Sequence, residues 1–180
     1  KKYRQLGARF LLFNYVTVDW MAIRSGPFPW DERSLRLYVE FCKRYLSVGG
    51  RTEKSDFLNG GFYLYEILKR PLSPPPATVW FAPGTEAIYG PGIMQDNLNQ
   101  PQKALESLLA AFKLVPDVGH VWNLLGHIYA KLNDPYKSYH YLKPFGAAGM
   151  MDSMNLGELG SAAVRVGDLD LAERVLADAM

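Results

Sequence analysis

The sequence predicts an all-α fold in which an N-terminal helical segment precedes a solenoid of helical hairpins. The first observation behind this prediction is a repeat, because the same residue types return at an interval of 34 residues. The residues that follow this interval most clearly are Gly92, Gly126 and Gly160, and Leu108, Leu142 and Leu176. The second observation is the helical spacing of apolar residues, and the third is the recurrence of turn residues in step with the repeat. A period of this length is typical of solenoids built from helix pairs.

The clearest hairpin begins with a helix that carries Trp122, Leu125 and Tyr129 on one face, because they are three and four residues apart. Asn133 is expected to end this helix, since asparagine and glycine tolerate the left-handed conformation at a helix C-terminus. Asp134 then has the position and side chain of an N-cap for the second helix. Local chemistry and the repeat therefore predict the same hairpin.

The recurrent glycines fall inside predicted helices, where glycine costs up to about 1 kcal/mol relative to alanine. Their recurrence indicates that another backbone comes too close for a side chain. A large residue at Gly126 is therefore expected to damage folding by overpacking this contact.

A family resemblance rests on the same stretch, which contains the pattern W-x2-L-G-x2-Y followed by a small residue. The residues that match are Trp122, Leu125, Gly126, Tyr129 and Ser138, with Ala104, Leu108, Ala111 and Pro116 in the preceding unit. Together they resemble the tetratricopeptide repeat. The resemblance implies a right-handed superhelix over residues 85–180, with units at about 85–118, 119–152 and 153–180, the last of them truncated.

Two prolines depart from the repeat pattern. Pro91 stands where Leu125 and Leu159 stand in the other units, so the first helix of the first unit is expected to be short or broken. Pro144 lies inside the second helix of the middle unit, which should end or kink near Leu142.

Residues 1–70 carry none of these landmarks, and their apolar spacing predicts about three helices. These helices are expected within 1–24, 31–50 and 55–70, either as degenerate repeats or as a distinct helical cap. Residues 71–84 are expected to form a proline-rich connector that acts as a stiff elbow.

Charge and cysteine content narrow the function classes. The net charge is +2, but residues 1–80 sum to +6 and residues 81–180 to −4. Three interpretations of the basic front half stay open: a solvated face, electrostatic attraction to the acidic second half, or contact with an acidic partner. Cys42 is the only cysteine, which excludes an internal disulfide and favours a reducing, cytoplasmic compartment. No stretch is long and apolar enough to span a bilayer, and we expect the chain to be a segment of a longer protein.

The sequence lacks the common catalytic, nucleotide-binding and zinc-binding motifs. It has no nucleophile elbow, no phosphate-binding loop and no dinucleotide-binding fingerprint. His120, His127 and His140 lack both the spacing of zinc ligands and a cysteine cluster beside them. The sequence therefore predicts no catalytic residue, no metal site and no cofactor, and a protein that is not an enzyme.

In tetratricopeptide arrays the first helices of successive units line a concave channel that binds a peptide segment or helix of a partner. The resemblance places this channel on the helix face turned away from Trp122, Leu125 and Tyr129. Mixed polar and aromatic side chains on that face suit hydrogen bonding to an extended backbone. The candidate partner-binding residues are His120, Asn123, His127, Lys131, Ser161, Arg165, Tyr89 and Asn97.

One partner class is not expected. Tetratricopeptide proteins that hold chaperone C-termini use a clamp of lysines and asparagines for the terminal carboxylate. Tyr89 and Ile93 stand where the first unit would need two of these residues. The sequence therefore does not predict a chaperone-type carboxylate clamp.

The function predicted from these features is a non-enzymatic scaffold that docks another protein within a larger assembly. One alternative is a helical-repeat segment of a larger enzyme whose catalytic domain lies outside this chain. Another is a helical repeat that binds nucleic acid through the basic N-terminal half. Basic residues there alternate with acidic ones, which disfavours this last alternative.

Overall fold

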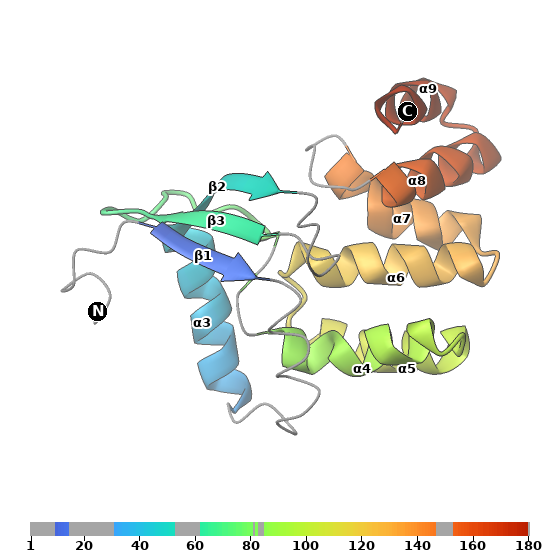
Figure 1. Cartoon of the computed structure of the whole chain (residues 1–180). Helices are drawn as coiled ribbons and strands as arrows, with labels where there is room; N and C mark the ends of the chain where they lie inside the picture. The colour runs from blue at the N-terminus through green and yellow to red at the C-terminus, as the bar shows by residue number, and fades with distance from the viewer. Residues whose placement is uncertain are drawn as a thin grey trace. The chain divides into compact units, whose positions relative to one another are not determined.

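The fold is that of a computed structural model, which describes residues 10–14, 31–52, 62–80, 82, 85–146 and 153–179. These residues form seven helices and three strands (Figure 1). The prediction that helices dominate and pack against their neighbours is confirmed. The chain divides into two compact units, Lys1–Gly90 and Pro91–Met180. The boundary falls inside helix α4, Glu86–Asn97.

The first unit contains a three-stranded antiparallel sheet with the strand order β1-β3-β2. Its strands are β1 (Phe10–Asn14), β2 (Leu46–Thr52) and β3 (Phe62–Ile67). The central strand β3 pairs with both neighbours, and Leu64 lies opposite Leu12 of β1 and Gly50 of β2.

Two of the three helices expected in residues 1–70 are wrong where the structure describes them. Phe10–Asn14 and Phe62–Ile67 were expected to be helical but pair as strands. Both runs are short and rich in large apolar and aromatic residues, which suit strands as well as helices. Pairing between residues far apart in sequence decides such cases, and helical periodicity cannot detect it. Residues 68–70, at the end of the third predicted helix, are not helical either. Residues 1–9, 15–24 and 55–61 of the two predicted helices lie outside the described residues.

The expected second helix is present as α3 (Glu32–Tyr45). The Asp31 carboxylate accepts a hydrogen bond from the Ser34 amide at 3.0 Å and caps the helix N-terminus. The helix ends at Tyr45, before the predicted Gly50, because the residues that follow join the sheet as β2. The pairing of β2 with β3 shifts register between Val48 and Gly50, and a bulge of this kind is a common place for glycine in a strand.

The second unit is helical throughout its described part. Its helices after α4 are α5 (Pro101–Leu114), α6 (Gly119–Lys131), α7 (Pro135–Gly146), α8 (Ser153–Val166) and α9 (Leu169–Asp178). From α5 onwards each helix packs against the next one in the chain, and α6 also packs against α8 (Figure 1). The side chains of Ser107 on α5 and Gln95 on α4 are hydrogen-bonded to each other, at 2.7 Å.

The expectation that helices end at the two prolines is wrong. The helix α4 runs for 12 residues with Pro91 inside it. Likewise α7 continues through Pro144 to Gly146, past the stop expected near Leu142. Leu142 and Phe145 are both buried on either side of Pro144. Their packing holds the helical path although the proline removes one backbone hydrogen bond.

The turns between paired helices follow the predicted interval. Asn99, Asn133 and Gly167 take positive φ values of 54°, 59° and 88°, which is the left-handed cap expected from their residue types. The aspartates after the second and third turns cap the next helices. Asp134 accepts a hydrogen bond from the Lys137 amide at 3.1 Å, and Asp168 accepts one from the Leu171 amide at 3.3 Å.

The close approach predicted at the recurrent glycines is confirmed, although the nearest neighbour in each case is a leucine side chain and not the expected backbone. A Cβ atom added at Gly92, Gly126 or Gly160 would lie 2.6, 2.4 or 2.5 Å from the Cγ atom of Leu108, Leu142 or Leu176, respectively. Real Cβ atoms do not approach other atoms so closely. Each glycine therefore lets the leucine of the paired helix sit directly on its backbone.

An aromatic cluster fills the middle of the second unit. The Trp122 ring meets Phe112 of α5 and Tyr141 of α7 edge to face, with centroids 5.2 and 5.6 Å apart. Its Nε1 atom donates to the Pro116 carbonyl at 2.7 Å, and Tyr129 stacks on Tyr141. Trp122 thus joins three successive helices, which explains its place at the head of the best-formed repeat.

Candidate functional site

The structure separates the eight predicted partner-binding residues by exposure. Tyr89, His120 and Asn123 are buried, with 0%, 8% and 5% of their surface exposed. His127 is half-buried, whereas the exposed members are Asn97, Lys131, Ser161 and Arg165. Gly119 and Val121, on either side of His120 in the first turn of α6, are also buried. The helix face opposite Trp122 is therefore accessible only towards the C-terminal end of α6.

His127 bridges three helices of the second unit. Its Nδ1 atom lies 2.7 Å from Glu158 Oε1 on α8, and its Nε2 atom lies 3.1 Å from Asp96 Oδ2 on α4. Asp96 also accepts a hydrogen bond from Lys131 Nζ at 2.6 Å. The four side chains form an alternating chain of acid and base across α4, α6 and α8.

The geometry of this bridge favours the charged imidazolium form of His127. A neutral imidazole has one N–H group and can donate to only one of the two carboxylates. The hydrogen bond to Glu158, and the negative charges of Glu158 and Asp96, raise the pKa of His127 above its usual value, against burial and the Lys131 charge. When His127 is protonated, the bridge therefore ties the middle hairpin to both of its neighbours.

Sequence reasoning did not select Asp96 or Glu158, although a signal for both was present. Each acid is 31 residues from His127, one before it and one after it. Thirty-one is three less than the repeat interval of 34 residues. Each acid therefore lies three residues from the position equivalent to His127 on its own helix, and residues three apart share a helix face. Adjacent first helices in a regular stack bring such residues together, so the repeat could have been used to find them.

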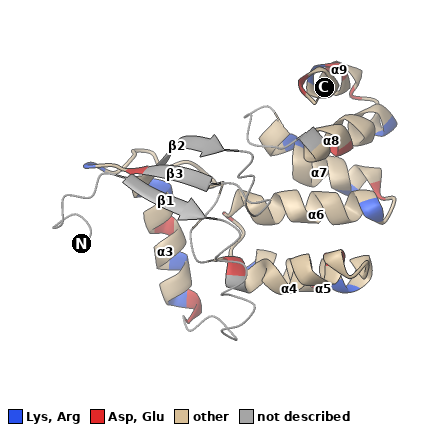
Figure 2. Cartoon of the chain, viewed as in Figure 1, with Lys and Arg blue, Asp and Glu red and all other residues tan. Residues whose placement is uncertain are grey.

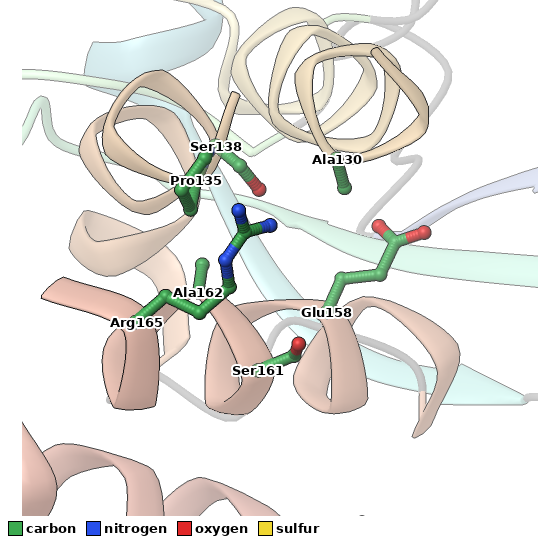
Figure 3. Close-up of a pocket in the computed structure, with 7 residues that line it drawn as sticks. All are labelled: Ala130, Pro135, Ser138, Glu158, Ser161, Ala162 and Arg165. Carbon is green, nitrogen blue, oxygen red and sulfur yellow. The ribbon is translucent and has the colours of Figure 1, made fainter. Parts of the chain in front are cut away.

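A pocket of about 100 Å³ lies beside the bridge, between α6, α7 and α8 (Figure 3). Ala130 and Pro135 form part of its apolar wall, and Ser138, Glu158 and Arg165 supply polar groups. Figure 3 shows the Arg165 guanidinium and the Ser138 hydroxyl on one side of the pocket, with the Glu158 carboxylate on the other. The Arg165 Nη1 atom donates to Asn133 Oδ1 at 2.7 Å.

Two polar atoms of this pocket have no hydrogen-bond partner. The Ser138 side chain is fully buried, and its Oγ atom makes no hydrogen bond within the described chain. The Glu158 Oε2 atom is also buried and unpaired, while Oε1 of the same carboxylate faces His127. Buried polar atoms left unpaired cost roughly 1–3 kcal/mol each. Water or another polar group from outside the chain is what would pair them.

We define the α6–α8 polar face as His127, Lys131, Ser161 and Arg165. It consists of the candidate residues that are accessible or half-buried and that lie on the two adjacent helices α6 and α8. Asn97 is exposed at the end of α4. Two of the four members, Ser161 and Arg165, also line the pocket.

Three further kinds of site were considered in the described part of the chain: a metal site, a membrane-spanning helix and a basic surface. No three His, Cys, Asp or Glu side chains there are placed to hold a metal ion. No helix in the same part has the length and apolar character needed to cross a membrane. Figure 2 shows basic and acidic positions interspersed along α3. Glu40 contacts both Lys43 and Arg44, at 3.2 and 2.8 Å.

No protein-family model matches the chain, and no curated protein matches it significantly. The resemblance to the tetratricopeptide repeat therefore rests on the residues and the interval themselves.

Proposed function

We propose that residues 85–180 form a right-handed solenoid of tetratricopeptide-like hairpins, and that this solenoid is a non-enzymatic scaffold that docks another protein. The partner contributes a peptide segment or a helix, which lies along the α6–α8 polar face. The observation that carries this proposal is the pocket at the edge of that face, with its unpaired Ser138 hydroxyl.

The recurrence of the hairpins supports the solenoid. Three glycine–leucine contacts and three left-handed turns repeat in step. A repeat of this kind buries its apolar side by stacking and leaves a continuous outer surface for a partner.

The exposed part of the polar face supports docking to a polypeptide. Lys131 and Arg165 offer charged donors, and Ser161 offers a hydroxyl. Such groups can hydrogen-bond the carbonyl oxygens of an extended peptide, whose own backbone groups are otherwise exposed to water.

The proposal is tested by selecting peptides from a random library displayed on phage, using the whole chain as bait. Affinities of the selected peptides are then measured by fluorescence anisotropy for the wild type and for Arg165→Met and Lys131→Met. Loss of a charged hydrogen bond costs roughly 1.5–3 kcal/mol, so binding should weaken by about tenfold or more. Arg174→Met, at an exposed arginine of α9, is the matched control.

Recovery of specific peptides whose affinity falls in the two face variants but not in the control would support docking on this face. Failure to select any specific peptide, or equal affinities for all variants, would overturn it.

A further inference from the structure

The pocket beside the polar face has a donor side and an acceptor side. The Arg165 guanidinium can only donate, and the Ser138 hydroxyl can donate from a fully buried position. The opposite side carries Glu158 Oε2, an acceptor that is buried and unpaired. A ligand group that satisfies both sides must accept on one side and donate on the other.

We propose that this pocket takes the primary carboxamide of an asparagine or glutamine side chain that the docked partner presents. The inference rests on the proposed docking function and names the side chain that the partner uses. The carboxamide oxygen accepts from Ser138 and Arg165, and its NH₂ group donates to Glu158 Oε2.

Other side chains fit the same pocket less well. A carboxylate would meet the Glu158 carboxylate at close range without a proton to share. A lysine ammonium would meet the Arg165 guanidinium and could not accept from Ser138. An apolar side chain would leave the buried Ser138 and Glu158 oxygen atoms unpaired, which is the costly outcome for a desolvated site.

The size of the pocket also suits a side-chain head group. A cavity needs a volume of roughly 10–15 Å³ to hold a single water molecule, and the volume of this pocket is about 100 Å³. It therefore has room for a small planar group in place of a few waters. Ala130 and Pro135 supply apolar surface for the methylene that carries the carboxamide.

Ser138 also has an internal comparison within the repeat. The residues one period away are Ala104 and Ala172, both of them buried like Ser138. Alanine at this position is thus compatible with the hairpin. The hydroxyl at Ser138 is therefore not required for packing, and Ser138→Ala should fold.

The test is an NMR titration of the whole ¹⁵N-labelled chain with two capped amino acids, N-acetyl-glutamine methylamide and N-acetyl-glutamate methylamide. The two probes differ only at the side-chain head group. We expect the glutamine probe to shift the Ser138 and Ser161 amides and the Arg165 side-chain signal saturably, with at least fivefold weaker binding of the glutamate probe. Ser138→Ala and Arg165→Met should each weaken the glutamine probe by at least threefold, while Arg174→Met should not.

No saturable shift with the glutamine probe, equal affinity for the two probes, or undiminished binding by both pocket variants would overturn the assignment. If phage-selected peptides still bind through Lys131 and Arg165 in that case, the carboxamide assignment fails and docking stands. If the glutamine probe binds as expected but no peptide can be selected, the pocket stands and the docking function fails.

Discussion

The middle hairpin, α6–α7, and the last hairpin, α8–α9, share their local chemistry but differ in how deeply they are packed. Both have a glycine under a leucine and a left-handed turn before an aspartate cap. The leucine of the middle hairpin, Leu142, is 0% exposed, whereas Leu176 in the last hairpin is 38% exposed. The same local signals thus specify the same shape, while neighbouring hairpins decide how much each contact stabilises it.

The largest expected effect comes from removing the leucine in each hairpin. Leu142→Ala should lower the free energy of unfolding by about 2–5 kcal/mol, because a cavity remains in the core. Leu176→Ala should cost only about 1–2 kcal/mol, because its side chain already contacts water. Urea denaturation followed by far-UV circular dichroism measures both. Equal losses would break the comparison.

The glycine beneath each leucine gives a second, smaller contrast. In Gly126→Ala the added methyl group should overpack the contact with Leu142, at a cost of about 1–3 kcal/mol in the free energy of unfolding. The higher helix propensity of alanine should offset up to about 1 kcal/mol of this cost. In Gly160→Ala the exposed Leu176 can move outwards, so the net change should stay within about 0.5 kcal/mol. The same denaturation experiment checks this pair. A harmless Gly126→Ala, or a harmless Gly126→Leu, would show that the contact is looser than its geometry indicates.

The turns should behave alike in the two hairpins, because their strain is local. Asn133→Ala and Gly167→Ala each place alanine at a positive φ and should each cost about 1–2 kcal/mol. Asn133→Gly serves as the control and should change stability little. A large difference between the two alanine variants would mean that the turns, too, depend on their neighbours.

The His127 bridge predicts the smallest effect, a dependence of stability on pH. The pKa of His127 is raised in the folded chain above its usual value of 6.5, chiefly by the hydrogen bond to Glu158. Its contribution is therefore complete below about pH 6.5 and is lost as the pH rises through the folded pKa. Urea midpoints of the wild type should fall over this range more steeply than those of His127→Gln.

His140→Gln is the matched control, since His140 lies outside the bridge and packs near Trp122. It should keep the pH dependence of the wild type. Parallel pH profiles for the wild type and His127→Gln would show that the bridge does not stabilise the stack.

The second unit could be predicted from sequence because its signals are local and repeat. Asn133 and Asp134 mark the turn between α6 and α7, and Gly126 marks a close contact in the same hairpin. All three can be recognised without knowing which distant residues come near them. In the first unit, Leu12 and Leu64 could be placed only by knowing that they pair. Helical spacing alone could not supply that information.

The site was predicted only in part, for a related reason. Lys131, Ser161 and Arg165 are accessible as expected from their helix face. Asn123 was expected on the same face but is buried. The position of a residue on its helix gives the direction of the side chain, but its exposure also depends on which other elements cover that part of the helix. Ser138 was interpreted as a small packing residue, and only the structure shows its hydroxyl unpaired at a pocket.

Hydrogen–deuterium exchange of the whole chain, read by mass spectrometry, tests most directly whether neighbours hold each hairpin in place. The amides of α6 and α7 should exchange slowest in the second unit, through opening of the whole stack, and those of α9 clearly faster, through local opening. Protection of α9 equal to or greater than that of α6 would contradict this account.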